Sequence, residues 1–149
     1  MKTIITNKEG LYSYEVLEKF QAGLVLTGPE TKSVKLGQVS LKGSFIQIDS
    51  KNEAWLVNSY VGAYKPAKGH QIGYEPERRR KLLLNRKEID SLIGKKQQKG
   101  LTIIPISIYT NRRLVKVEIA LAKGKTKIDK RESIKKREVQ REISRTLKR

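Results

Sequence analysis

LTIIPISIY, residues 101–109, is the most apolar stretch of this 149-residue chain. It is rich in the β-branched residues that favour strands. The turn TNRR (110–113) and a second apolar stretch, LVKVEIAL (114–121), follow it, which predicts an antiparallel hairpin over residues 101–121. Pro105 cannot donate a ladder hydrogen bond and therefore predicts a sheet edge or a β-bulge at its position.

Shorter strands are predicted upstream of this hairpin. Residues 12–20 alternate between polar and apolar side chains, and Gly23 is expected to end that strand before residues 24–26 return as its partner. Residues 44–48 and 53–57 form a second predicted hairpin around a polar turn, and residues 60–64 are expected to extend the sheet.

Two helices interrupt these strands. One begins near Thr27, with Pro29 in its first turn, and ends at Gly37. The other begins at Asn85, where Glu88 three residues later completes a capping box. Because hairpins dominate and no β-α-β repeat is present, we predict a mainly β fold, a small antiparallel barrel or curled sheet with helices packed against it.

Composition excludes several classes of protein. The chain has no Cys, which excludes disulfides and Cys-based zinc sites, and its single His, His70, has no catalytic partner in sequence. We therefore expect no enzyme, metal or cofactor, and a cytoplasmic protein without a membrane span. The chain carries 33 Lys and Arg against 15 Asp and Glu, a formal net charge of +18, so a polyanion is the expected partner.

The most basic internal segment, residues 78–99, holds nine basic and two acidic residues and begins RRRKLLLN. We interpret it as a phosphate-binding patch; a solvated helix face is the alternative. Three successive leucines, 82–84, cannot all face one core from an extended chain, so one is expected to be exposed unless a turn buries all three. Asn85 is favoured as a helix cap, and its amide would alternatively hydrogen bond a base edge.

Aromatic residues are few. Phe45 and Trp55 lie in alternating strands and are expected in the core, whereas Tyr64 and Tyr74 lie in a loop and are freer to stack on bases. His70, in the same loop, is expected at the surface.

The last 27 residues form a predicted basic tail, separate from the domain at residues 1–122. This tail, residues 123–149, has three times as many basic as acidic residues and few apolar ones, so we expect disorder in isolation and a helix in the bound state. Gly124 lies within a lysine cluster, where it is expected to give the backbone freedom to approach phosphate.

Several of these motifs resemble the small protein B (SmpB) family, also called SsrA-binding proteins, over nearly the whole chain. Gln21 stands where the family usually has Glu. The resemblance rests on Asn7-Lys8, Tyr14, Phe20, Ala22-Gly23, Gly28, Glu30, Lys32-Ser33, Gly37, Pro76, Arg78, residues 80–84, Glu88-Ile89, residues 100–105, Tyr109, residues 122–125 and residues 129–131.

The resemblance implies an OB-type β-barrel with two or three peripheral helices. It also implies binding of one copy to the tRNA-like domain of transfer-messenger RNA (tmRNA) and rescue of stalled ribosomes by trans-translation. Alanyl-tRNA synthetase and elongation factor Tu would be reached through the RNA. The residues that the resemblance and the charge pattern assign to RNA binding are Gln21, Gly23, Arg78, Arg80, Lys81, Leu83, Asn85, Lys123, Gly124, Lys125 and Lys127.

In the family the tail enters the 16S rRNA decoding centre and the empty mRNA channel. The corresponding residues here are Asp129, Lys130, Arg131, Lys135, Lys136, Arg137, Arg141 and Arg145. A structural rRNA-binding OB-type ribosomal protein is the alternative function. A nuclease on the same barrel is disfavoured because the sequence has no carboxylate cluster for a metal.

Overall fold

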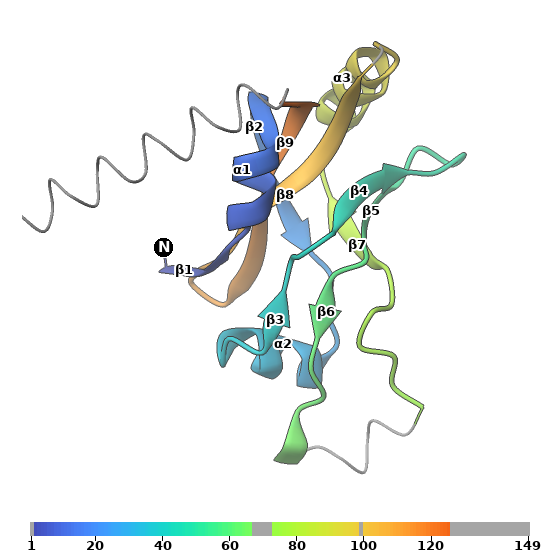
Figure 1. The fold of residues 1–149 in the computed structure, drawn as a ribbon. Helices are drawn as coiled ribbons and strands as arrows, with labels where there is room; N and C mark the ends of the chain where they lie inside the picture. The colour runs from blue at the N-terminus through green and yellow to red at the C-terminus, as the bar shows by residue number, and fades with distance from the viewer. Residues whose placement is uncertain (1, 67–72, 99, 126–149) are drawn as a thin grey trace, which may run out of the picture.

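The hairpin predicted over residues 101–121 is present, and its two strands are 11 residues long each (Figure 1). The computed structural model of the chain describes residues 2–66, 73–98 and 100–125. The helices in these ranges are α1 (Lys8–Ser13), α2 (Gly28–Lys35) and α3 (Arg86–Lys96). The strands are β1 (Lys2–Thr6), β2 (Tyr14–Leu24), β3 (Val39–Ser40), β4 (Phe45–Ile48), β5 (Ala54–Val57), β6 (Tyr60–Val61), β7 (Arg80–Leu83), β8 (Leu101–Asn111) and β9 (Leu114–Gly124).

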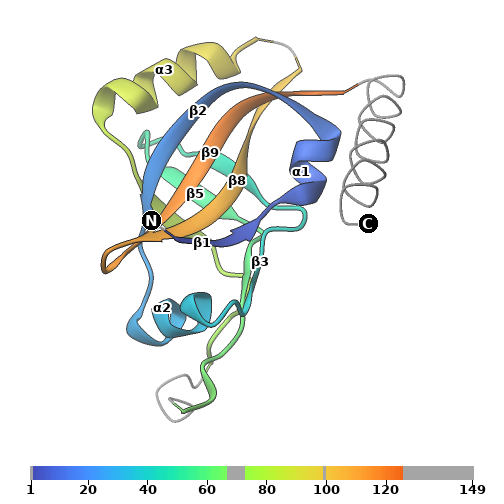
Figure 2. The same cartoon turned by 90° about the vertical axis from the view of Figure 1, so that its left-hand side faces the viewer.

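The strands form one large sheet and one small one. The main sheet has seven strands in the order β1-β8-β9-β2-β7-β5-β4, and β3 pairs with β6 separately. Every pair is antiparallel. The main sheet curls until β4 lies against β8 (Figure 2). The mainly β, antiparallel prediction with peripheral helices is therefore confirmed.

Pro105 lies at a β-bulge, as predicted. The register of β8 against β9 shifts between Pro105 and Ser107. The backbone N–H of Asn7 donates to the Ile106 carbonyl at 2.7 Å, and its side-chain amide donates to the Pro105 carbonyl at 2.8 Å. Asn7 thus satisfies carbonyls at the bulge, and its side-chain oxygen also caps α1 by accepting from Gly10 N–H at 3.1 Å.

The predicted break at Gly23 is wrong. β2 runs without interruption through Gly23 to Leu24, because that end pairs on both sides, with β9 and with β7. Residues 24–26 are therefore not a returning hairpin strand, and residues 12 and 13 belong to α1 rather than to β2. Residues 60 and 61 pair with β3 outside the main sheet, so they do not extend it as expected.

Both predicted helices begin at capping boxes. In α2 the Thr27 hydroxyl accepts from Glu30 N–H and the Glu30 carboxylate accepts from Thr27 N–H; Asn85 and Glu88 repeat this exchange in α3. Gly37 follows α2 with φ +81°, a conformation that glycine adopts without a steric penalty.

The core lies inside the curl of the main sheet and includes Leu92 of α3. Ile46 of β4 and Leu56 of β5 are each 1% exposed. Side chains alternate along a strand, so this burial turns Phe45 and Trp55 to the opposite face. Phe45 is 37% exposed and Trp55 is half-buried, so the prediction that both lie in the core is wrong.

Candidate nucleic-acid interface

The outward face of β2 lies at the centre of the candidate site. Phe20 and Ala22 point into the core, whereas Lys19, Gln21 and Gly23 alternate with them on the outside. The neighbouring strands continue this face, because Gly23 lies opposite Lys116 of β9 and, on the other side, opposite Leu83 of β7.

A groove of about 420 Å³ crosses this face. Its lining includes Gly23, Leu83, Arg113 in the turn before β9, and Leu114 and Lys116 at the start of β9. Leu83 and Leu114 are 57% and 63% exposed, which is unusual for leucine in paired strands. The groove therefore combines apolar surface with two cations, a composition suited to RNA bases and riboses beside phosphates.

The structure confirms the prediction for the leucine run. Leu82 is 2% exposed, Leu83 projects outward, and Leu84 packs partly against the core. Alternation along β7 separates Leu82 from Leu83, as expected for an extended chain.

Gln21 belongs to a polar cluster that joins three strands. The Tyr109 hydroxyl of β8 donates to the Gln21 side-chain oxygen. The Gln21 amide nitrogen in turn donates to Glu118 Oε2 of β9 at 2.9 Å, and Lys19 Nζ lies 3.6 Å from Glu118 Oε1. Burial, and then the nearby Glu118 carboxylate, raise the pKa of the Tyr109 hydroxyl, so this group remains a donor at neutral pH.

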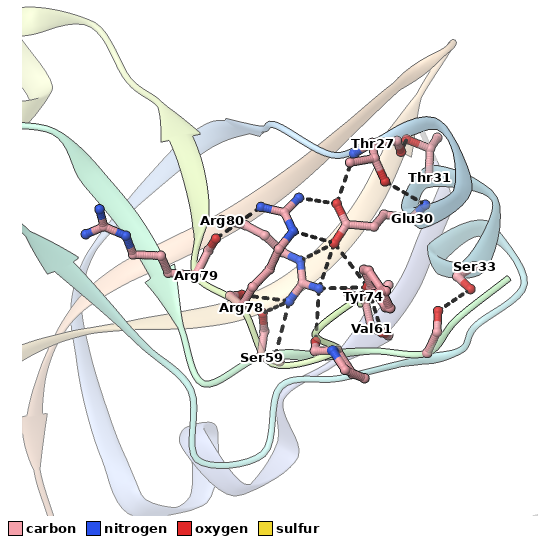
Figure 3. A network of polar contacts seen from close by, with 12 residues as sticks. Thr27, Glu30, Thr31, Ser33, Ser59, Val61, Tyr74, Arg78, Arg79 and Arg80 are labelled. Carbon is pink, nitrogen blue, oxygen red and sulfur yellow. Dashed lines mark hydrogen bonds and ion pairs between the residues drawn. The ribbon is translucent and has the colours of Figure 1, made fainter. Parts of the chain in front are cut away.

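A buried ion pair joins Glu30 of α2 to Arg80 of β7 (Figure 3). Their side chains are 1% and 0% exposed, and Arg80 Nη2 lies 2.7 Å from Glu30 Oε2. Arg78 also contacts this carboxylate, with its Nε 3.1 Å from Glu30 Oε2. Burial raises the pKa of Glu30, but hydrogen bonds from Arg78, the Thr27 backbone and Arg80 outweigh it and lower that pKa to about 2.

Arg80 also donates hydrogen bonds to neutral groups. Its Nη2 donates to the Tyr74 hydroxyl and to the Pro76 carbonyl, both at 2.9 Å, and its Nη1 lies 3.2 Å from the Ser59 hydroxyl. The Tyr74 hydroxyl lies 2.8 Å from the Val61 carbonyl oxygen. Tyr74 is thus part of this network, and the prediction that it is freer to stack on bases is wrong.

These contacts correct the prediction for the basic segment. Arg80 does not face phosphate, because alternation in β7 places it on the core side with Leu82. The Arg78 side chain is 35% exposed and paired with Glu30. Lys81 points outward; its side chain is 41% exposed and its Nζ lies 3.7 Å from a Glu53 carboxylate oxygen.

Arg79 turns away from the buried network (Figure 3). Its guanidinium lies 4.0 Å from the centre of the Trp55 ring, in a cation–π contact. The Trp55 ring nitrogen donates to Asp49 Oδ2 at 2.9 Å, which fixes the ring on the outside of β5. The centre of the half-buried Tyr64 ring, assigned to the same predicted loop as Tyr74, lies 5.4 Å from Lys32 Nζ.

Asn85 is the N-cap of α3, as favoured; its side-chain oxygen accepts from Glu88 N–H at 2.8 Å. Asn85 is exposed, two residues after Leu83, so the cap leaves it accessible to RNA.

The domain boundary lies beyond residue 122. Lys123 and Gly124 continue β9, opposite Glu15 and Tyr14. Gly124 is therefore held in a ladder, contrary to the flexibility expected for it. Lys125 N–H donates to the Ser13 carbonyl at 2.9 Å. Lys127, the other tail residues assigned above and His70 lie outside the described residues.

Sequence reasoning missed several residues of this face, namely Tyr109, Arg113, Leu114, Lys116 and Glu118. Strand parity was an available signal: residues 116 and 118 alternate with buried valines, so a hairpin prediction already places them outward. Their proximity to Gly23 was not available, because it depends on the pairing of β2 with β9.

Within the described ranges, no group of three or more His, Cys, Asp or Glu side chains is placed to hold a metal ion. In the same residues, no helix is both long and apolar enough to cross a membrane.

Comparisons with known proteins agree on one family. The sequence profile of the SmpB protein family matches residues 4–149. The SsrA-binding protein of Sulfurihydrogenibium sp. is 50% identical over 99% of this chain and 95% of its own length. That of Persephonella marina is 48% identical with the same coverage. A solved structure titled "tmRNA-SmpB: a journey to the center of the bacterial ribosome" matches with a TM-score of 0.67 and 40% identity over 87% of this chain and 93% of its own. The chain belongs to the SmpB family of SsrA-binding proteins.

Proposed function

We propose that this protein binds the tRNA-like domain of tmRNA and delivers it to stalled ribosomes for trans-translation. Relatives that span the whole chain are SsrA-binding proteins, and the matching solved structure concerns tmRNA and SmpB in the ribosome. The observation that carries the proposal is the groove lined by Gly23, Leu83, Arg113, Leu114 and Lys116, which combines exposed leucines with cations.

The composition of the groove matches the requirements of a folded RNA. Arg113 and Lys116 would bind phosphates, while Leu83 and Leu114 would lie against bases or riboses that are not stacked in a duplex. Lys81, which points to the same side of the sheet as Leu83, would extend the phosphate contacts along β7. The net charge of +18 would hold the complex together and make it sensitive to salt.

The ribosomal part of the proposal rests on the tail. The tail residues from Asp129 to Arg145 assigned above would contact the decoding centre and the empty mRNA channel, where confinement among phosphates would order a segment too polar to fold alone. Alanyl-tRNA synthetase and elongation factor Tu would be reached through the bound RNA. Truncation after Arg131 is expected to preserve RNA affinity and to abolish tagging of stalled peptides. Full tagging by the truncated protein would remove the decoding role from the tail.

The RNA-binding step is tested by sequencing the RNA that co-purifies with the full chain. The affinity for the isolated tRNA-like domain is then compared with the affinity for an rRNA hairpin of equal length. Enrichment of tmRNA and tighter binding of its tRNA-like domain are expected. Equal affinity for both RNAs, with copy numbers equal to those of ribosomes, would favour the structural ribosomal protein instead.

A further inference from the structure

Glu118 is a carboxylate on the same face as the cations Lys19 and Lys116. It lies on β9, two residues after Lys116 and opposite Gln21 of β2. Its side chain is 25% exposed, so it remains accessible to a partner. A negative charge here repels every phosphate that Lys116 and Arg113 attract, and a surface built only to bind phosphate gains nothing from it.

Three side chains hold this carboxylate in place. Gln21 donates to its Oε2 at 2.9 Å and Lys19 lies 3.6 Å from its Oε1. Tyr109, itself 6% exposed and anchored in β8, donates to the Gln21 oxygen and so directs the Gln21 N–H toward Glu118. An ionised carboxylate has about four acceptor positions, so two contacts leave others for a partner. The arrangement is that of a fixed acceptor.

We propose that Glu118 accepts a hydrogen bond from a donor group of the bound RNA, with Gln21 and Tyr109 as its positioning residues. Phosphate oxygens only accept, so the donors available in RNA are base amino and imino groups and ribose 2′-hydroxyls. Glu118 thus adds recognition to a face whose cations contribute affinity alone. This inference rests on the proposed tmRNA-binding function.

The need to position Glu118 also explains why a glutamine suits position 21. A neutral amide accepts from Tyr109 with its oxygen and donates to Glu118 with its nitrogen. A glutamate at this position would place a second carboxylate beside Glu118 and would provide no N–H. Position 21 therefore supports the acceptor on the neighbouring strand in this chain.

The test is E118Q in the full-length protein, with the tRNA-like domain as the probe. Loss of a charge-assisted hydrogen bond is expected to weaken binding about tenfold at fixed salt. Charge attraction alone predicts tighter RNA binding by E118Q, because the substitution removes a negative charge from a surface that faces a polyanion. E15Q is the matched control: Glu15 is exposed on β2, and its neutralisation is expected to leave affinity unchanged or slightly higher.

A second variant and a modified RNA complete the experiment. Y109F, which removes only the hydroxyl, is expected to weaken binding less than E118Q while its thermal midpoint stays close to wild type. The same affinities are measured with 2′-fluoro RNA, whose ribose cannot donate a hydrogen bond. If wild type and E118Q then bind equally, the donor is a 2′-hydroxyl. If the difference in affinity persists, the donor is a base. Equal or tighter binding by E118Q overturns the inference. Failure of the wild-type protein itself to prefer the tRNA-like domain would instead overturn the proposed function.

Discussion

Gly23 of β2 lies directly opposite Leu83 of β7, and a Cβ atom added to Gly23 would lie 3.3 Å from the Leu83 Cβ atom. This distance is shorter than ordinary carbon–carbon contact. Because glycine has no side chain, the Leu83 side chain has room beside Gly23 in the groove. Any larger residue there would push Leu83 toward the space that we assign to RNA.

Gly23→Ala is accordingly expected to weaken RNA binding more than it changes folding. The free energy of unfolding should change by less than about 1 kcal/mol, because the loss of chain entropy in the unfolded state offsets the tight contact. Gly94→Ala is the control, since a Cβ at Gly94 in α3 meets nothing within 4 Å. Titration of labelled RNA and thermal unfolding of both variants check this, and unchanged affinity in Gly23→Ala would contradict it.

Leu83 and Leu82 are adjacent residues with opposite expected roles. Leu83→Ala should cost little stability and should lower RNA affinity about five- to tenfold, because an exposed leucine would lose its burial against the ligand. Leu82→Ala removes a side chain that is 2% exposed, and should cost about 2–5 kcal/mol of unfolding free energy. Denaturant unfolding and RNA titration of the pair separate the two effects. A large loss of unfolding free energy in Leu83→Ala would instead show that Leu83 contributes to the stability of the fold as a core residue does.

The buried Glu30 predicts a dependence of stability on pH. Its folded-state pKa of about 2 is below the ordinary value of 4.5, so its contribution is complete above pH 4.5 and is lost as the pH falls toward 2. Glu30→Gln should cost about 3–5 kcal/mol at neutral pH, since two guanidiniums lose their counter-charge. It should also flatten the decline in stability between these pH values. Glu53→Gln, at an exposed pair with Lys81, should cost about 0–1 kcal/mol. Equal decline in wild type and Glu30→Gln on acidification would disprove the assignment.

Salt titrations should separate the cations of β7. If about 6–10 phosphates are contacted, affinity falls roughly 10³–10⁵-fold between 50 and 200 mM salt. Lys81→Ala should lower the slope of log affinity against log salt by about one contact. Arg80→Lys should leave the slope unchanged and should lower stability, since Arg80 is fully buried. A reduced slope for Arg80→Lys would mean that this side chain reaches phosphate in the complex.

Local signals in the sequence were sufficient for much of this fold. Pro29 marked the start of α2, and the Asn85–Glu88 capping box marked the start of α3. Two apolar stretches around the turn at residues 110–113 marked the long hairpin, and Pro105 marked its bulge. β1 was not predicted, because its five residues carry no turn signal and form a strand only by pairing with β8. The strand end predicted at Gly23 was wrong for a related reason. Pairing with β7 on one side and β9 on the other keeps this residue in β2.

In the candidate site, too, local features could be predicted from the sequence, whereas features set by distant contacts could not. Exposure of one leucine in the run 82–84 followed from chain geometry, whereas the burial of Arg80 depended on Glu30, 50 positions away in sequence. A charged side chain enters a core only where a partner of opposite charge is already placed. The carboxylates nearest to Arg80 in the sequence, Glu75 and Glu77, are not this partner, and the three neighbouring cations suggested a surface.

The order of strands in the main sheet also sets when the chain is able to fold. β1 and β2 pair with β8 and β9, and the register partners Lys2 and Thr110 are 108 positions apart. During synthesis, these first strands leave the ribosome with exposed edges long before their partners exist. The complete sheet therefore assembles only after residue 124 has emerged. Chains dominated by such distant pairings fold slowly, so we expect newly made copies to depend on protection from aggregation during that interval.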